Sequence, residues 1–185
     1  MRMPRTLAFV TSLVLVGCLP PSSLQPSAPI MSTEGQMPDQ LVLTSPEFKD
    51  GGAIPRRFTC DAENVSPPLS WSGAPAGAVT LALVMDDPDA RGFVHWVVYG
   101  IPPGTQGLAE GSLPSDARQG ANGRNQDQWA GPCPPVGSAP HHYRFTLTAV
   151  SKSLALAPGA TAAQVKAAMA GSIIGQGLLV GLYGR

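Results

Sequence analysis

The chain has 185 residues, enough for one globular domain with a substantial core. The 12 Lys and Arg residues balance 12 Asp and Glu residues, and no basic run occurs, which argues against nucleic acid as a partner. Only 13% of the residues are charged, whereas 21 are Gly and 20 are Pro. This composition favours many short strands joined by tight turns over long solvated helices.

The N-terminal residues have the organisation of a bacterial export signal. Arg2 and Arg5 give a positive start, and residues 7–17 form an apolar run that is too short to cross a bilayer, which takes roughly 20 helical residues. The run ends in Leu-Val-Gly-Cys, which resembles the lipobox of bacterial lipoproteins and implies a diacylglycerol on Cys18. We therefore expect a signal peptide at residues 1–17 and an exported protein that is lipid-anchored in the bacterial cell envelope.

The next segment, residues 18–39, is rich in Pro and Ser and has little charge before Glu34. Such a segment buries too little apolar surface to fold, so we expect a tether here and the folded domain at residues 40–185. It could serve as a stalk that lifts the domain off the bilayer, or it could simply be a disordered N-terminus.

Two cysteines remain if Cys18 is acylated, namely Cys60 and Cys133. In an exported protein two remaining thiols suggest a disulfide. Two buried free cysteines that pack as small hydrophobes are the alternative, and the sequence leaves both open.

Strand patterns dominate the folded part. Apolar runs, aromatic and β-branched residues or strict alternation predict strands at residues 41–44, 79–85, 93–101, 143–150 and 178–183. Residues 104–128 are polar and poorly patterned, which predicts a long surface loop. A helix is predicted to begin after Thr161, with Gln164 completing a capping box, and to stop at Gly171. These elements predict a mainly β fold, an antiparallel β-sandwich with one or two short C-terminal helices.

The three histidines lie in two segments that border turns. His95 follows an Asp-Pro-Asp turn, and the two-residue period of a strand places it on the same face as Val97. On the later strand His141 is in phase with Tyr143, on the apolar inward side, whereas His142 is on the polar outward side.

Asp87 in that turn suggests how these histidines could be used. A carboxylate that is hydrogen-bonded to an imidazole fixes its tautomer and favours its protonated form, which leaves the other N–H as a charge-assisted donor. Histidinium, a tyrosine hydroxyl and N–H groups of the Pro-rich loop at residues 131–137 would suit a phosphate or carboxylate. Alternatively, each histidine is a hydrogen-bonded residue near the core.

Several motifs in this order resemble the phosphatidylethanolamine-binding protein family, most closely its bacterial Raf-kinase-inhibitor-like branch. They are Asp87-Pro88-Asp89-Ala90, His95-Trp96-Val97-Val98-Tyr99, Gly131-Pro132-Cys133-Pro134-Pro135 and His141-His142-Tyr143, with similar segments at residues 66–71 and 179–185. The resemblance implies an antiparallel β-fold with a pocket for phosphate, phosphoryl head groups or similar anions. It assigns pocket positions to Asp87, His95, His141 and Tyr143, and the pocket-lining loop to Gly131 and Pro134.

Two positions depart from the family pattern. Arg91 stands where many members have Pro, which puts the shape of the pocket rim in doubt, although a solvated turn residue is the simpler interpretation. His142 replaces the usual Arg, and its outward position predicts a smaller effect. The second Asp of the turn, Asp89, is expected to be structural.

The function we expect is non-enzymatic binding of a small anion or phospholipid head group, without a cofactor or a metal. Because family members elsewhere inhibit kinases or proteases, the resemblance also allows an unidentified protein partner. One alternative is a hydrolase or metal-dependent enzyme that uses the same Asp and His residues. The sequence has no H-E-x-x-H or G-x-S-x-G motif to support it. Another alternative is a surface interaction protein with a vestigial pocket.

Overall fold

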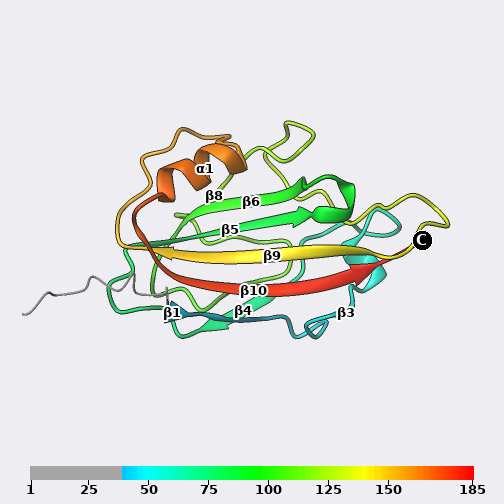
Figure 1. The fold of residues 1–185 in the computed structure, drawn as a ribbon, viewed down its shortest axis with the longest axis horizontal. Helices are drawn as coiled ribbons and strands as arrows, with labels where there is room; N and C mark the ends of the chain where they lie inside the picture. The colour runs from blue at the N-terminus through cyan, green and yellow to red at the C-terminus, as the bar shows by residue number, and fades with distance from the viewer. Residues whose placement is uncertain (1–38) are drawn as a thin grey trace, which may run out of the picture. The chain divides into compact units, whose positions relative to one another are not determined.

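The computed structural model describes residues 39–185, which fold into two β-sheets and one α-helix (Figure 1). The predicted signal peptide, the predicted lipidation site Cys18 and all but the last residue of the predicted tether lie outside the described residues. The main path of the larger sheet is β1 (Asp39–Gln40), β10 (Ile173–Tyr183), β9 (His141–Val150), β5 (Thr80–Asp87), β6 (Phe93–Ile101) and β8 (Arg118–Gln119). The smaller sheet has the order β2 (Val42–Thr44), β4 (Leu69–Ser72) and β7 (Gly107–Leu108).

The prediction of a mainly β fold is confirmed, and most neighbouring strands run antiparallel. The exception is the edge formed by β10, where β1 and β3 (Gly52–Ala53) pair in parallel. The larger sheet is therefore mixed at this edge, which the sequence did not indicate.

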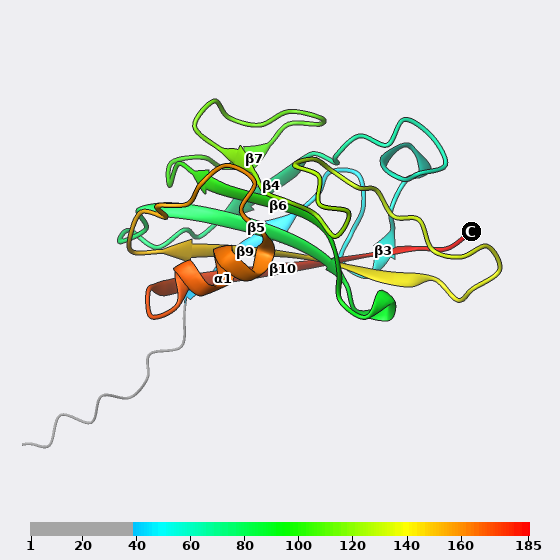
Figure 2. The ribbon, with the colours of Figure 1, turned by 90° about the horizontal axis from the view of Figure 1, so that it is seen from above.

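Both faces of the larger sheet carry apolar residues. One face packs against the smaller sheet in a cluster that includes Leu83 and Phe145 from the larger sheet and Leu69 and Trp71 from the smaller one. Part of the other face is covered by α1 (Ala162–Met169), as Figure 2 shows. Because β5 is buried on both faces, its sequence reads as an almost continuous apolar run and not as an alternation.

Helix α1 begins where its sequence predicts. The Thr161 hydroxyl accepts a hydrogen bond from the backbone N–H of Gln164, and the Gln164 side chain accepts one from the backbone N–H of Thr161. This reciprocal cap satisfies N–H groups that have no partner inside the helix. The helix buries Val165 and Met169 against the larger sheet.

Two predicted segments differ from the structure. The last strand was predicted at residues 178–183, but β10 begins at Ile173 and has 11 residues. The predicted loop at residues 104–128 contains the short strands β7 and β8, and it also buries Ala121 and Asn122. Both segments pair with strands that are distant in the sequence, which a local pattern cannot report.

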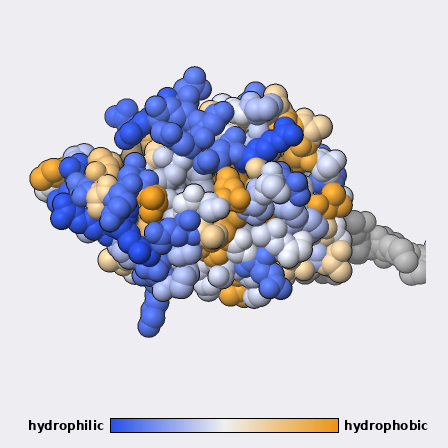
Figure 3. All heavy atoms as spheres, turned by 180° about the vertical axis from the view of Figure 1, so that it is seen from behind, coloured by the Kyte–Doolittle hydropathy of each residue, from blue (hydrophilic) through white to orange (hydrophobic). Residues whose placement is uncertain are grey.

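No helix within residues 39–185 is long and apolar enough to cross a bilayer. On the face drawn in Figure 3, apolar residues of the described domain occur in separate small groups among polar ones.

Candidate functional site

A β-bulge in β6 directs His95 toward the site. In the pairing of β5 with β6, Met85 lies opposite Trp96, but Asp86 lies opposite Val94, so His95 is the extra residue. A bulge of this kind re-aims a side chain. The ring of His95 lies 5.1 Å from the ring of Tyr143, edge to face.

The predicted shared face of His95 and Val97 is therefore wrong. Val97 packs in the cluster beside α1, whereas Tyr143 belongs to the cluster between the two sheets. The bulge breaks the two-residue period on which that prediction depended. It also places His95 with Tyr143, which the period alone did not do.

Strand β9 supplies two further site residues with the predicted alternation. His141 is partly buried and Tyr143 is fully buried, whereas His142 between them is exposed. The rings of His141 and Tyr143 lie 6.4 Å apart and nearly parallel. The ring of Tyr143 thus lies beside both histidine rings, so the structure brings His95 and His141 to the same place.

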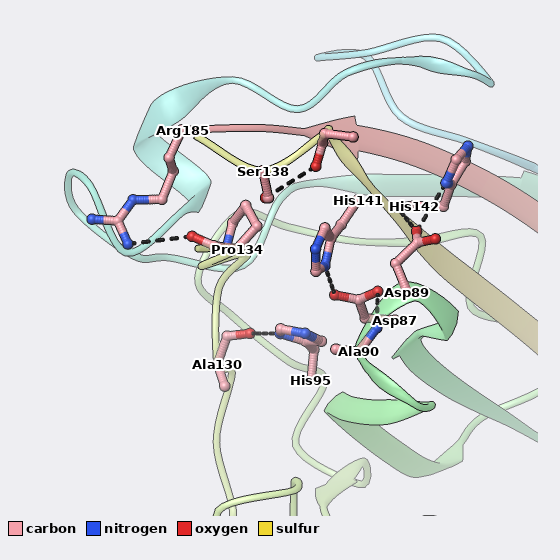
Figure 4. A network of polar contacts seen from close by, with 11 residues as sticks. Asp87, Asp89, Ala90, His95, Ala130, Pro134, Ser138, His141, His142 and Arg185 are labelled. Carbon is pink, nitrogen blue, oxygen red and sulfur yellow. Dashed lines mark hydrogen bonds and ion pairs between the residues drawn. The ribbon is translucent and has the colours of Figure 1, made fainter. Parts of the chain in front are cut away.

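Asp87, the last residue of β5, joins this group. Its Oδ2 lies 2.7 Å from Nδ1 of His141 (Figure 4), and its Oδ1 accepts a hydrogen bond from the backbone N–H of Ala90. The second bond caps the short 3-10 helix η2 (Pro88–Ala90). The carboxylate therefore holds the turn and orients the imidazole of His141 at the same time.

His95 has a different partner from His141. Its Nδ1 lies 2.6 Å from the backbone oxygen of Ala130 (Figure 4). A carbonyl oxygen only accepts, so Nδ1 must carry the proton of this contact. The other ring nitrogen, Nε2, takes no part in it. Burial lowers the pKa of His95, although the Ala130 carbonyl and the Asp87 carboxylate act in the opposite direction. Burial therefore favours the neutral form of His95, whereas the sequence suggested a protonated imidazole.

The hydroxyl of Tyr143 is the least satisfied polar group of the site. It is buried and has no hydrogen-bond partner among residues 39–185. Burial, and next the negative charge of Asp87, raise the pKa of this hydroxyl, so it stays protonated. A buried O–H group without a partner costs free energy, and the donor capacity of this hydroxyl is unused among residues 39–185.

The Pro-rich loop at residues 131–137 is fixed by contacts that its own sequence does not reveal. The backbone N–H of Gly131 donates to the side-chain oxygen of Asn64 at 3.0 Å. Cys133 is joined to Cys60 by a disulfide, so the two cysteines are bonded and not free, a point that the sequence left open. Pro134 is buried, and its carbonyl oxygen lies 3.5 Å from the guanidinium of Arg185 (Figure 4).

The exposed residues around the turn form a second pair. Asp89 accepts hydrogen bonds from the backbone N–H and from Nδ1 of His142. These bonds lower the pKa of Asp89. Arg91 is exposed and has a left-handed backbone conformation, φ 58°, at the end of η2. Asp89 thus ties the turn to β9, as expected for a structural residue.

Sequence reasoning missed two contributors to the site. Asn64 and Ala130 act through one hydrogen bond each, across 67 and 35 residues of sequence, and no local signal marks either. The two-residue period of the strand predicts Phe93 on the same face as His95, and its ring lies 4.8 Å from that of His95.

Two observations concern the alternatives. Within residues 39–185 no group of three or more His, Cys, Asp or Glu side chains is placed to hold a metal ion. A groove of about 640 Å³ lies elsewhere, between α1 and the exposed face of β9 and β10, and residues such as Thr146, Lys166 and Leu178 line it. The polar contacts described above, and not the size of a cavity, single out the Asp87 group.

Known proteins resemble this chain over most of its length. A model of the family described as phosphatidylethanolamine-binding protein matches residues 44–184. A Mycobacterium tuberculosis protein named "Putative lipoprotein LppC" is 46% identical over 154 residues, which cover 82% of this chain and 76% of that protein. A UPF0098 protein of Methanothermobacter thermautotrophicus is 48% identical over 145 residues, which cover 75% of this chain and 95% of that protein.

Solved structures give the same result for the fold. The crystal structure of CT736 from Chlamydia trachomatis matches with a TM-score of 0.73 and 36% identity, over 80% of this chain and 98% of that one. YbcL of E. coli, described as a member of the mammalian PEBP family, matches with a TM-score of 0.73 and 30% identity. The match covers 78% of this chain and 98% of that one.

Proposed function

Because the chain belongs to the phosphatidylethanolamine-binding protein family, we propose that the group formed by Asp87, His95, His141 and Tyr143 binds a small oxyanion, such as phosphate or a phosphoryl head group, without chemical conversion. Gly131 and Pro134 would form the wall of this pocket. A ligand oxygen would accept a hydrogen bond from Tyr143 and lie against the two histidine rings.

The buried Tyr143 hydroxyl is the single observation that supports this proposal most strongly. Native proteins rarely leave such a group without a partner, because the cost of its desolvation is not recovered. A bound oxyanion would supply the missing acceptor. The neighbouring carboxylate of Asp87 accepts from His141 and from the N–H of Ala90, and no hydrogen bond joins it to Tyr143.

A tyrosine substitution tests the proposal directly. We expect Tyr143→Phe to weaken the binding of inorganic phosphate by roughly 10–100-fold, the value of a hydrogen bond to a charged group, without lowering the stability of the fold. Titration calorimetry on the full-length protein in a non-ionic detergent measures the affinity. Tyr99→Phe is the matched control, because its hydroxyl donates to the Ala157 carbonyl outside the pocket. Equal phosphate affinity for the wild type and Tyr143→Phe would refute this role.

The place of the protein in the cell is part of the same proposal. We infer that the protein is exported and anchored to the bacterial envelope through lipid on Cys18, and the lipoprotein name of the mycobacterial relative supports this. Cys18→Ser should then move the protein from the detergent phase to the aqueous phase of a phase separation. Retention of Cys18→Ser in the detergent phase would contradict lipid anchoring at this residue.

A further inference from the structure

The groove between α1 and the outer face of β9 and β10 has the features of a second binding site. We propose that it binds one molecule of an anionic amphiphile with a single apolar chain, such as a long-chain fatty acid. This site is separate from the group around Asp87, and it does not depend on the ligand of that group.

The groove lies on the other face of the larger sheet. Side chains alternate along β9, so Tyr143 and Phe145 point into the cluster between the two sheets, whereas Thr146 points to the opposite face and lines the groove. Helix α1 covers only part of that face, and Figures 1 and 2 show β9 and β10 continuing beyond it. The volume of about 640 Å³ lies within the range of roughly 300–1,000 Å³ that is usual for small-molecule pockets.

Exposed apolar side chains gather at this groove. Five large hydrophobic residues are exposed within residues 39–185, and three of them line the groove. They are Val42 and Leu178, each 55% exposed, and Ile173, which is 42% exposed. The lining also includes the buried residues Val84 and Met169. A group of exposed apolar residues marks an interaction surface, because a ligand that covers them removes apolar area from water.

The net charge of the groove comes from one lysine. Three charged side chains line it, and two of them neutralise each other, since Arg144 donates to Asp86 through hydrogen bonds of 2.9 and 2.8 Å. The third is Lys166 of α1, which is exposed and whose ammonium has no ion pair or hydrogen bond among residues 39–185. One cation beside an apolar surface matches a molecule with one anionic group and one apolar chain.

A bilayer surface matches the groove less well. Docking on anionic lipids uses clusters of roughly four to eight Lys and Arg residues, whereas the groove has one unpaired cation. A groove also encloses a chain, whereas a flat surface meets only its rim. The lipid anchor proposed at Cys18 would keep the groove close to a source of such amphiphiles, because the 21 residues from Cys18 to Asp39 span at most roughly 70 Å.

Photo-crosslinking in vesicles tests the proposal. The full-length protein is reconstituted in phosphatidylcholine vesicles that contain hexadecanoic acid with a diazirine in its chain, at about pH 8.5, where the carboxylate is ionised. Mass spectrometry then locates the adducts, which we expect at residues 40–43 and 166–178. Val136 is the internal control, because it is 77% exposed but lies outside the groove, and apolar exposure alone would label it too.

The methyl ester of the same probe tests the charge, since it keeps the chain and removes the anion. It should label the groove about two- to fivefold less than the acid, the value of one exposed ion pair. Lys166→Gln should lower labelling by the acid to the level of the ester and leave labelling by the ester unchanged. Lys152→Gln is the matched control, because this exposed lysine does not line the groove and donates to the Ala170 carbonyl.

A second pair of variants tests the apolar surface. Leu178→Ser should lower labelling by both probes about three- to tenfold, because the bound chain then covers less apolar area, whereas Val136→Ser should change nothing. An excess of inorganic phosphate should not displace the acid, since the proposed oxyanion site lies on the other face of the sheet.

Four results would overturn the proposal. They are an absence of adducts in the groove, labelling of Val136 as strong as that of the groove, which would indicate contact with the bilayer surface, equal labelling by acid and ester, and displacement of the acid by phosphate. The phosphate affinity of Tyr143→Phe is measured separately, so each of these results leaves the proposed function in place.

Discussion

The Nδ1 atom of His141 lies 2.7 Å from Oδ2 of Asp87, and the two side chains keep only 15% and 3% of their surface exposed. One residue further along β9, Nδ1 of His142 lies 2.9 Å from Oδ2 of Asp89, with 56% and 41% exposed. The same contact thus occurs twice, once largely buried and once exposed to solvent. Comparing the two pairs separates the effect of burial on the free energy of unfolding from the effect of the contact itself.

The first prediction uses this pair of contacts. Asp87→Ala should lower the free energy of unfolding by about 1–3 kcal/mol, because it leaves the partly buried imidazole of His141 and the N–H of Ala90 without their acceptor. Asp89→Ala should cost clearly less, because water replaces the lost partner at an exposed pair. Urea unfolding of both variants measures the difference. If the two losses are equal, burial of the Asp87 contact has no energetic importance.

The second prediction concerns pH and follows from His95. Its pKa is lowered in the folded state, so below the ordinary pKa of about 6.5 the unfolded chain binds more protons than the native one. The stability contributed by the neutral imidazole is therefore present above pH 6.5 and is lost as the pH falls toward the lowered pKa. The loss should be at most about 1.4 kcal/mol per pH unit.

The control for this prediction is His95→Gln, which cannot titrate. Urea midpoints between pH 7.5 and pH 5 should fall more steeply for the wild type than for this variant. The lowered pKa values of Asp61 and Asp89 affect stability only at more acidic pH, so they do not interfere in this window. Parallel pH profiles for the two proteins would show that burial does not perturb His95.

The sequence predicts those parts of the site that depend on local periodicity. The alternation along β9 separates Tyr143 from His142, and the capping box predicts the start of α1. The same periodicity fails for His95, because the bulge inserts one residue against β5. A bulge is set by the pairing of two strands, so one strand's pattern does not reveal it.

Glycine explains why β10 is longer than predicted. Residues 173–183 contain three glycines, which weaken the strand pattern. Two of them are needed for close approach: a Cβ atom at Gly177 would contact the backbone of Leu41, and one at Gly181 would contact the side chain of Ile54. Gly in a strand often marks such contacts, which only the folded structure can show.

The third prediction tests the Pro-rich loop at Gly131. A Cβ atom at this position would overlap the side chain of Asn64 and lie 2.6 Å from the carbonyl oxygen of Phe58. Gly131→Ala should therefore cost about 1–3 kcal/mol of unfolding free energy and weaken phosphate binding, because the loop must shift away from Asn64. Gly104→Ala is the matched control, since a Cβ atom there meets nothing within 4 Å. Urea unfolding and calorimetry on both variants measure the effects, and wild-type behaviour of Gly131→Ala would contradict the close packing of this loop.

The fourth prediction concerns the disulfide between Cys60 and Cys133, which links residues 73 positions apart. A cross-link over a loop of this length restricts the unfolded chain, so its removal should lower the free energy of unfolding by about 2–4 kcal/mol. Both cysteines are partly exposed, so a reducing agent can reach the bond. Dithiothreitol should therefore destabilise the wild type in urea unfolding.

The double variant Cys60→Ser/Cys133→Ser is the control, because it should be as unstable as the reduced wild type and insensitive to dithiothreitol. Cys133 lies between Gly131 and Pro134 in the Pro-rich loop, and the N–H of Cys60 donates to the carbonyl of Pro132. Loss of the bond should thus also weaken phosphate binding, since the loop loses one of its three ties to the segment at residues 60–64. If reduction lowers stability but leaves the phosphate affinity intact, the disulfide supports the fold and not the pocket.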